Sequence, residues 1–98
     1  MTRILVAMLA YAALPAIAQD SPAARSLAAT CAACHGTDGR SVTKEVPGLA
    51  GLPKDHIVAQ MKAFRDGSRP ATVMQQIAKG YSEQQIELMA DYFARRPR

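Results

Sequence analysis

The chain opens with an uninterrupted apolar stretch and continues with segments whose apolar residues recur at helical spacing. The opening stretch, Ile4 to Leu14, contains no charged residue, and Arg3 precedes it. Pro15 ends the stretch and Ala16-Ile17-Ala18 follows, which is the order of a secretory signal peptide. We therefore predict a signal peptide over residues 1–18, cleaved after Ala18, and export through the Sec route to the periplasm. The eleven apolar residues are too few to cross a bilayer, so no stable membrane insertion is expected after cleavage.

After this opening, the pattern predicts helices joined by loops and no convincing strand. Ser21 and Pro22 form a helix start, with Ser as the N-cap and Pro in the first helical position. Strong helix formers continue over Ala23–Ala33. Residues 40–51 contain Pro47 and two glycines, so they predict an irregular loop.

Two helices are predicted between this loop and residue 80. Leu52-Pro53 opens the longer one, in which Ile57, Met61 and Phe64 recur at the spacing of one helix face. A turn then follows, and residues 71–79 predict a short helix.

The last helix is predicted to begin at Ser82, where Gln85 completes a capping box three residues later. Its apolar stripe consists of Ile86, Met89, Ala90 and Phe93. The fold class is therefore predicted to be all-α, with three or four helices in a single domain over residues 19–98.

Composition limits what such a helical chain can be. The 98 residues carry a formal charge of +4, and removal of Arg3 with the signal peptide leaves +3. This modest charge gives no reason to expect a nucleic-acid partner. Aromatic residues make up 5% of the chain, and small alanines supply much of its apolar content. A domain of this size with so few large side chains is normally stabilised by disulfides, a metal or a cofactor.

Six basic side chains in the second half of the chain either form a docking patch for an acidic partner or solvate the helix faces. They are Arg65, Arg69, Lys79, Arg95, Arg96 and Arg98. Because exposed Lys and Arg are usual on any protein surface, solvation is the simpler interpretation.

The motif Cys31-Ala32-Ala33-Cys34-His35 is the most informative feature of the sequence. C-x-x-C-H is the attachment signature of c-type haem. Two thiols at this spacing can bond to the two vinyl groups of one haem edge, while the adjacent His supplies an axial nitrogen to the iron. The macrocycle then becomes the largest apolar group of the domain, so the small side chains need only coat it. We predict one covalent haem c, held through Cys31 and Cys34, with His35 as an iron ligand.

Three other interpretations of the two cysteines fit the sequence less well. A dithiol redox pair usually sits in a thioredoxin-like βαβ fold, and that pattern is not apparent. A zinc site normally needs four ligands, and beyond the motif only His56 is a further strong candidate. A disulfide between Cys31 and Cys34 is strained and closes a very small loop.

The second axial ligand has to come from elsewhere in the chain. Met61 and Met89 lie on apolar helix stripes, where core packing is the simpler role. Met74 lies 39 residues after His35, behind a segment that has just left a helix. We therefore predict Met74 as the second ligand, with Met61 as the fallback. His56 is the remaining alternative, although its place on a polar helix face predicts a solvated residue.

Ligation by His35 and Met74 leaves no position on the iron for a substrate. This favours outer-sphere electron transfer, and no Ser-His-Asp set, paired-carboxylate site or phosphate-binding glycine loop indicates catalysis by the chain itself. The alternative is a haem enzyme or gas sensor, which requires an open sixth position.

Pro47 lies twelve residues after His35, in a loop that can return beside it. A ligating His usually donates its other ring N–H to a carbonyl or carboxylate group, and the Pro47 carbonyl is a candidate acceptor. Spacing alone does not decide between this role and that of an ordinary loop proline.

The order of Cys31-Ala-Ala-Cys-His35-Gly36, Pro47-Gly-Leu49-Ala-Gly51 and Met74 resembles that of class I c-type cytochromes. The match extends over residues 19–98, so the resemblance implies the cytochrome c fold around one covalently attached haem. In that fold the first and last helices cross beside the haem edge. Here the crossing would involve Ala28 or its neighbours and Tyr92 or Phe93.

The same resemblance implies a role for each matched residue. Cys31 and Cys34 would carry the haem, and His35 and Met74 would bind its iron. The carbonyl of Pro47 would orient the ligating His, and Leu49, in the same loop, would belong with the haem-binding residues.

A narrower resemblance rests on Arg69-Pro-Ala-Thr-Val-Met-Gln-Gln-Ile-Ala-Lys-Gly-Tyr-Ser82 and on Tyr92-Phe93-Ala94. These segments are similar to the haem subunit of flavocytochrome c sulfide dehydrogenase, in which a cytochrome pairs with a flavoprotein that oxidises sulfide. Many such subunits carry two C-x-x-C-H motifs, whereas this sequence has one. The resemblance implies a redox protein partner, namely a flavoprotein subunit. The alternative is a freely diffusing carrier that serves a terminal oxidase or reductase.

Overall fold

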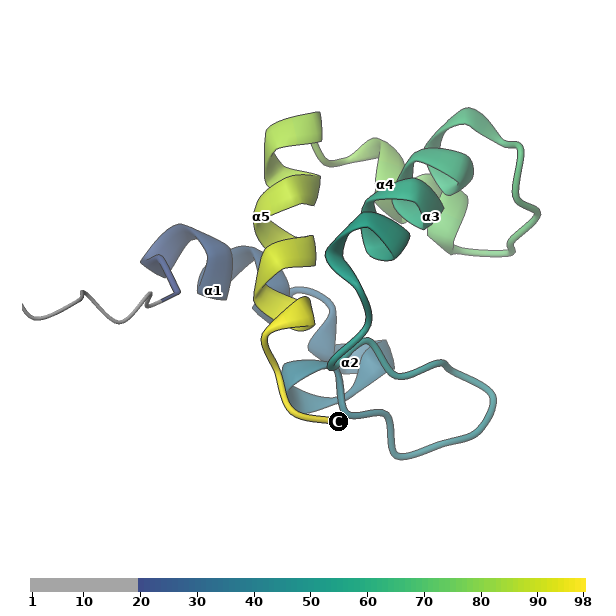
Figure 1. Ribbon diagram of the computed structural model, residues 1–98. Coiled ribbons are helices and arrows are strands. Elements are labelled where there is room, and N and C mark those ends of the chain that lie inside the picture. Colours follow the sequence, from purple (N-terminus) through teal and green to yellow (C-terminus); the bar gives the residue numbers. More distant parts are fainter. Residues whose placement is uncertain (1–19) are drawn as a thin grey trace, which may run out of the picture.

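The computed structural model describes residues 20–98, so the predicted signal peptide lies outside the described residues. Five α-helices and one short 3₁₀ helix follow each other along the chain, and residues 20–98 contain no strand (Figure 1). They are α1 (Pro22–Ala29), α2 (Ala32–His35), η1 (Thr37–Gly39), α3 (Lys54–Asp66), α4 (Met74–Lys79) and α5 (Glu83–Ala94). The all-α prediction is confirmed, with five α-helices where three or four were expected.

The additional helix arises because the segment predicted as one helix to Ala33 is broken. Ser21 caps α1 as predicted, since its hydroxyl accepts the Ala24 N–H at 3.1 Å. At the other end, the Thr30 N–H bonds to the Leu27 carbonyl at 3.1 Å, three residues back rather than four. The Thr30 hydroxyl donates to the same carbonyl at 2.6 Å. The chain therefore leaves the α-helix at Thr30 and re-enters it at Ala32.

Helices α3 and α4 occupy the two segments predicted for them, with one corrected boundary. α3 begins after Pro53 and ends at Gly67, whose φ of +83° is the left-handed conformation that often terminates helices. α4 begins at Met74 rather than at residue 71. The β-branched Thr72 and Val73 are poor helix formers, and Val73 has φ −121°, outside the helical range.

Helix α5 begins with the predicted capping box. The Ser82 hydroxyl accepts the Gln85 N–H at 3.1 Å, and the Gln85 side chain accepts the Ser82 N–H at 2.9 Å. The predicted apolar stripe, Ile86, Met89, Ala90 and Phe93, is buried along its whole length. This stripe is the centre of the core.

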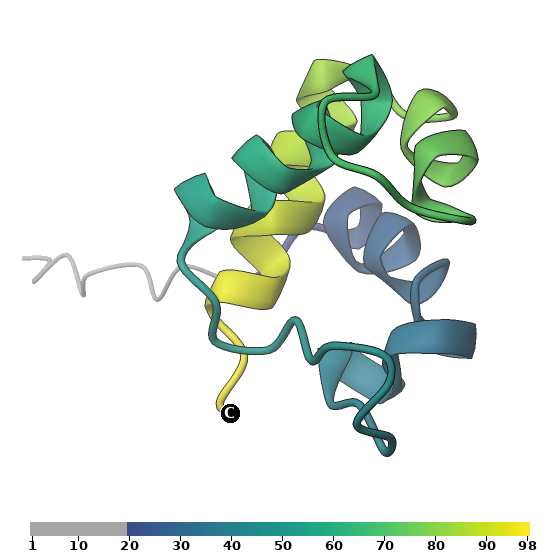
Figure 2. The ribbon, with the colours of Figure 1, turned by 90° about the vertical axis from the view of Figure 1, so that its right-hand side faces the viewer.

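Helix α5 packs against α1 on one side and α3 on another, and α4 packs against α3. In two views, α4 lies near the upper end of α5 and α2 near its lower end (Figure 1 and Figure 2). Ala28 of α1 and Phe93 of α5 belong to the same buried cluster. The predicted contact between the first and last helices is therefore confirmed.

The protein core contains few large side chains. Five of its ten buried hydrophobic residues are alanines. Ile86 is the only large side chain that is completely buried among residues 20–98. Seven partly buried residues pack around this cluster: Leu27, Cys31, Leu49, Leu52, Val58, Met61 and Tyr81. The polypeptide alone therefore encloses little apolar volume, as the composition indicated.

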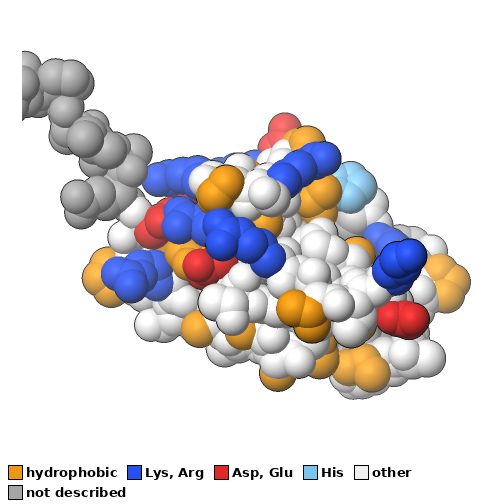
Figure 3. All heavy atoms as spheres, turned by 90° about the horizontal axis from the view of Figure 1, so that it is seen from below, with side chains coloured by type: hydrophobic (Ala, Val, Ile, Leu, Met, Phe, Trp, Pro, Cys, Tyr) orange, Lys and Arg blue, Asp and Glu red, His pale blue; other side chains and the backbone are white. Residues whose placement is uncertain are grey.

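Charged side chains are paired where the two ends of the described chain meet. Asp20 forms ion pairs with Arg95 and Arg96, and Arg95 also pairs with Asp91 one helical turn away. The Arg96 guanidinium stacks over the Tyr92 ring, 4.2 Å from its centroid. Seen from below, basic and acidic side chains are interleaved over this face (Figure 3). Arg95 and Arg96 are therefore engaged within the fold rather than part of a free basic patch.

Candidate functional site

The C-x-x-C-H motif forms a single helical turn at α2. Cys31 is the N-cap of α2, and its carbonyl accepts the N–H of Cys34 at 3.4 Å and of His35 at 2.9 Å. Because residues three apart in a helix are neighbours, this turn places both thiols on one side. The two cysteines are free, with Cys31 half-buried and Cys34 exposed. Burial raises the pKa of the Cys31 thiol, which keeps it protonated near neutral pH.

Gly36 turns the chain immediately after His35. Its φ of +83° and ψ of 166° lie in a region that essentially only glycine adopts. A Cβ atom here would lie 2.0 Å from the carbonyl oxygen of Arg40. The reversal after the motif therefore requires glycine for both its backbone conformation and its lack of a side chain.

Gly39 brings the loop of residues 40–51 against the motif. Its carbonyl accepts the N–H of Leu49 at 2.8 Å and of Ala50 at 3.1 Å. A Cβ atom on Gly39 would come within 2.8 Å of both the Ala50 nitrogen and a ring carbon of Phe93. This close approach fixes the position of Pro47, which lies two residues before Leu49.

The His35 ring is oriented by that loop. Its Nδ1 lies 2.8 Å from the carbonyl oxygen of Pro47. A carbonyl oxygen can only accept, so Nδ1 carries the ring proton and the lone pair of Nε2 is available to a metal. The structure thus contains the hydrogen bond between His35 and Pro47, which residue spacing alone could not decide.

The other candidate ligands lie in different surroundings. Met74 is half-buried and is the first residue of α4. Met89 is 3% exposed in the core, and Met61 is half-buried and packs against the core. Both thus have the packing role predicted for them. His56 is exposed on α3, where a solvated histidine was predicted.

The residues around the motif fit a covalently bound haem. The motif offers two free thiols and a histidine whose unprotonated nitrogen is free. Leu49, Leu52 and Met61 are apolar and only partly covered by the rest of the core. A small core of alanines with such a partly exposed margin suits a large apolar group attached at α2.

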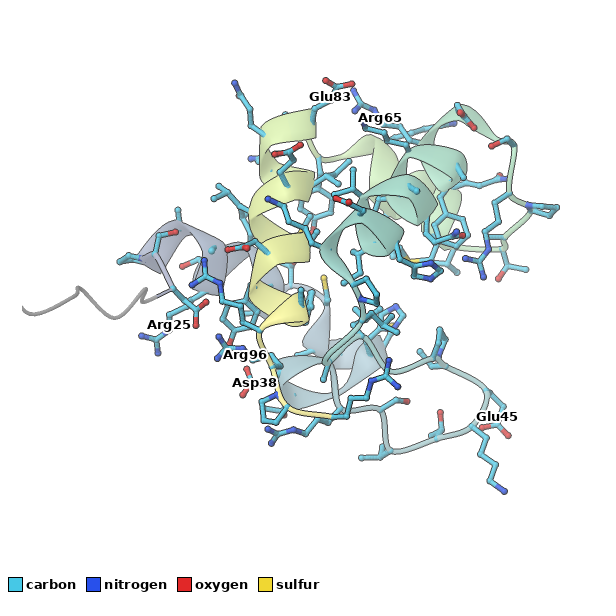
Figure 4. The ribbon with its side chains drawn as sticks, viewed as in Figure 1. Arg25, Asp38, Glu45, Arg65, Glu83 and Arg96 are labelled. Carbon is cyan, nitrogen blue, oxygen red and sulfur yellow. The ribbon has the colours of Figure 1, made fainter. Side chains whose placement is uncertain are left out.

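Possible metal ligands and a surface cavity are two further features of residues 20–98 that bear on this site. No group of three or more His, Cys, Asp or Glu side chains within residues 20–98 could hold a metal ion. A surface cavity of about 460 Å³ lies between α1, η1 and α5 and is lined by Arg25, Asp38 and Tyr92 among others. Ala32 of the motif also lines it, whereas Cys31, Cys34 and His35 do not. Arg25 and Asp38, two of its lining residues, are labelled in Figure 4.

Two tyrosines contact the motif region although the sequence did not single out either hydroxyl. The Tyr92 hydroxyl donates to Oδ1 of Asp38, in η1, at 2.6 Å, and this hydrogen bond raises the pKa of Tyr92. The Tyr81 hydroxyl lies 2.6 Å from Oγ1 of Thr30. Each pair is separated by more than 50 residues, so no local sequence signal could have identified it.

None of the helices within residues 20–98 is long and apolar enough to cross a membrane. The segment predicted as a signal peptide is not among these residues.

Comparison with known proteins identifies relatives of the whole described domain. The family model described as Cytochrome c matches residues 22–95. The chain is 43% identical over 67 residues to the cytochrome subunit of sulfide dehydrogenase of Chlorobaculum tepidum, which covers 68% of this chain and 60% of that protein. It is 35% identical over 97 residues to cytochrome c4 of Pseudomonas aeruginosa, covering 96% of this chain and 48% of that protein.

A third relative has nearly the length of the matched region. Cytochrome c-554(548) of Halomonas halodenitrificans is 36% identical over 80 residues, which are 79% of this chain and 96% of that protein. The chain thus spans about half the length of the first two relatives and almost all of the third.

Proposed function

The chain belongs to the cytochrome c family and is an electron-transfer cytochrome with one haem-attachment motif in its 98 residues, and on this premise we propose that His35 and Met74 hold its iron. Proteins of this family carry covalent haem c, and Cys31, Cys34 and His35 fit one such group. We further propose that residues 19–98 are the haem domain and that it works in the periplasm after cleavage behind Ala18.

One observation carries the proposal for the first ligand. The hydrogen bond from Nδ1 of His35 to the Pro47 carbonyl fixes both the tautomer and the orientation of the ring. A ring that donates from Nδ1 is also a stronger electron donor at Nε2, because the hydrogen bond leaves electron density on the imidazole. Gly36, just before η1, and Gly39, its last residue, hold this arrangement in place by shaping the backbone.

The chain's own residues would then perform three tasks. Cys31 and Cys34 hold the cofactor permanently, so it cannot be lost to solvent. His35 and Met74 would both hold the iron, which would exclude substrates from it and keep its protein ligands the same in both oxidation states. The Met thioether favours reduced iron and so raises the reduction potential. When bound, haem c supplies one-electron chemistry between ferric and ferrous iron.

We propose that the electron donor of this cytochrome is a dehydrogenase that oxidises an inorganic sulfur compound. The first candidate is a flavoprotein subunit of sulfide dehydrogenase. The similarity to the cytochrome subunit of sulfide dehydrogenase supports this choice. Two relatives named as thiosulfate dehydrogenase electron acceptors, from Thiomonas intermedia and Stutzerimonas stutzeri, support the broader class of donor.

A second candidate is a freely diffusing carrier between a reductase and an oxidase. It is favoured by the match to cytochrome c-554(548), because the chain covers 96% of that protein and so is comparable with it in size. The two candidates share the haem site and differ only in whether a partner stays bound.

The ligand assignment is tested by carbon monoxide binding to the reduced protein. The wild type should resist carbon monoxide if His35 and Met74 both hold the iron. Met74→Leu removes one ligand with little change in volume and should bind carbon monoxide rapidly. Met61→Leu is the matched control, because it changes the fallback methionine on α3 and should behave as wild type.

The outcomes separate the alternatives. Rapid binding by the wild type would contradict ligation by two side chains and favour a haem enzyme or gas sensor. Rapid binding by Met61→Leu but not by Met74→Leu would move the ligand to α3.

Size-exclusion chromatography of native periplasmic extract tests the partner. Haem and flavin absorbance in one larger peak would support a flavocytochrome subunit, and sulfide would be the first donor to test. Haem that elutes alone at the size of a small monomer would favour the diffusible carrier.

A further inference from the structure

A hydrogen bond joins the haem-attachment segment to the segment that follows Met74. Oγ1 of Thr30, the residue before Cys31, lies 2.6 Å from the hydroxyl of Tyr81. The Thr30 hydroxyl has one proton, and it is donated to the Leu27 carbonyl at 2.6 Å. Tyr81 must therefore be the donor and Thr30 the acceptor. We refer to this hydrogen bond as the Thr30–Tyr81 clasp.

The Thr30–Tyr81 clasp links two parts of the fold, residues 20–39 and residues 67–82. Within residues 20–98, it is the only hydrogen bond that joins residues 20–39 to residues 67–82. Helix α4 packs mainly on α3, whereas α1 packs on α5. The helix packing that links the two parts therefore runs mainly through α3 and α5.

Both ends of the clasp are held firmly by their own segments. Tyr81 directly precedes Ser82, which forms the capping box of α5. The Tyr81 N–H bonds to the carbonyl of Ala78, a residue that is completely buried. Tyr81 itself is half-buried and packs against the core. Thr30 lies where α1 ends, and its Oγ1 is 4.0 Å from Sγ of Cys31. A movement of α4 is therefore transmitted to the residue that adjoins the first thiol.

We propose that Tyr81 is a positioning residue, which holds α4, and with it Met74, at a constant distance from the Cys31–His35 turn. Because thioether ligation depends on that distance, loss of the clasp should let Met74 leave the iron more often. This inference rests on the proposed ligation by Met74.

The test compares Tyr81→Phe with wild type in the haem-loaded protein. The substitution removes the donor hydroxyl and keeps the ring in its packing. A neutral hydrogen bond corresponds to about a fivefold change in an equilibrium, so we expect carbon monoxide to bind the reduced variant about fivefold faster. Hydrogen exchange of the α4 amides should accelerate by a similar factor, and the absorption band of methionine-ligated ferric haem should weaken at a lower temperature.

Tyr92→Phe is the matched control. It removes the same hydroxyl group from another tyrosine that contacts the motif region, but its partner Asp38 is in η1 and its own helix is α5. We expect it to reduce global stability without changing carbon monoxide binding. Thr30→Ser retains the acceptor hydroxyl and should resemble wild type.

Equal rates of carbon monoxide binding in wild type and Tyr81→Phe would overturn the proposal. It would also be overturned if Tyr92→Phe accelerated binding as much as Tyr81→Phe, because that result would reveal a general loss of stability. Failure of the proposed ligation has a different signature, because wild type would then bind carbon monoxide rapidly before any substitution.

Discussion

The turn after the motif depends on residues that have no side chain. Gly36 reverses the chain directly behind His35, and Gly39 allows the loop to approach within hydrogen-bond distance. The result is a backbone carbonyl at 2.8 Å from the His35 ring. Because the acceptor is a backbone group, no side-chain substitution at Pro47 removes it directly. The glycines are therefore the positions at which the orientation of His35 can be disturbed.

We expect Gly36→Ala to lower the free energy of unfolding by about 3 kcal/mol or more and to reduce the yield of haem-loaded protein. The added Cβ would lie 2.0 Å from the Arg40 carbonyl oxygen, in a backbone conformation that alanine rarely adopts. Guanidinium denaturation and haem staining of equal amounts of protein measure the two effects.

Gly67→Ala provides the matched control for this prediction. Gly67 has the same φ of +83°, but a Cβ atom there would meet nothing within 4 Å. Its expected cost is about 1–2 kcal/mol from the backbone conformation alone. If the two variants lost equal stability, the contact with Arg40 would have no importance.

The residues of the motif could be predicted from the sequence because their chemistry depends on spacing along the chain. Two thiols and an imidazole in five residues need only one helical turn to act together. The acceptor of the His35 proton could not be decided in this way. Its position depends on the bonds from the Gly39 carbonyl to Leu49 and Ala50, ten and eleven residues further along the chain.

At the scale of the helices, most starts and stops follow from local sequence signals. Ser21 and Ser82 cap the helices that they were predicted to begin, and Gly67 ends α3. The break between α1 and α2 was not predicted, because alanine-rich sequence favours a continuous helix. The break lies at Thr30, whose hydroxyl is bonded to Leu27 and also to Tyr81, 51 residues away. The sequence around Thr30 gives no sign of Tyr81 as a partner.

We expect Ser82→Ala to lower the free energy of unfolding by about 1 kcal/mol. The substitution removes the hydroxyl that accepts the Gln85 N–H and so opens the capping box of α5. Thermal or guanidinium unfolding followed by circular dichroism measures the loss.

Ser26→Ala is the control, because Ser26 is exposed on α1 and alanine is the better helix former. Its stability should stay within about 0.5 kcal/mol of wild type. A loss in Ser82→Ala no larger than in this control would show that the capping box adds nothing to the packing of α5.

At the scale of the whole molecule, contacts between distant segments hold a small core together. Tyr92 donates to Asp38, and the Gly51 N–H bonds to the Phe93 carbonyl at 2.9 Å, so α5 is tied both to η1 and to the following loop. Asp20 connects the beginning of the described chain to Arg96 near its end. Asp38 and Arg96, both labelled in Figure 4, each contact Tyr92 at this end of α5. These polar links act around a core in which five of the ten buried hydrophobic residues are alanines.

The Tyr92–Asp38 bond predicts how stability changes at high pH. The bond raises the pKa of Tyr92 above the ordinary value of about 10. A group with a raised folded-state pKa stabilises the protein fully below its unfolded pKa, and this contribution is lost as the pH rises through the folded value. We therefore expect Tyr92→Phe to be less stable than wild type by about 1 kcal/mol at pH 7.5. The difference should shrink above about pH 10.

Guanidinium denaturation of the haem-loaded proteins at several pH values measures this difference. Asp38→Asn supplies the control, because it removes the negative charge beside the Tyr92 phenol. The pKa of Tyr92 should then fall, so that the stability contributed by Tyr92 is lost at lower pH. A difference between wild type and Tyr92→Phe that stayed constant to pH 11 would contradict the assigned cause.

The sequence by itself determined the haem-attachment motif and most of the helix starts and ends of this protein. A haem-attachment motif, helix caps and apolar stripes are local patterns, because they depend on groups a few residues apart. Tertiary structure alone decided that the Pro47 carbonyl meets His35, that Tyr81 reaches Thr30 and that α1 breaks beside Cys31. Each of these contacts joins groups whose separation depends on how complete helices and loops pack, and residue spacing carries no information on that distance.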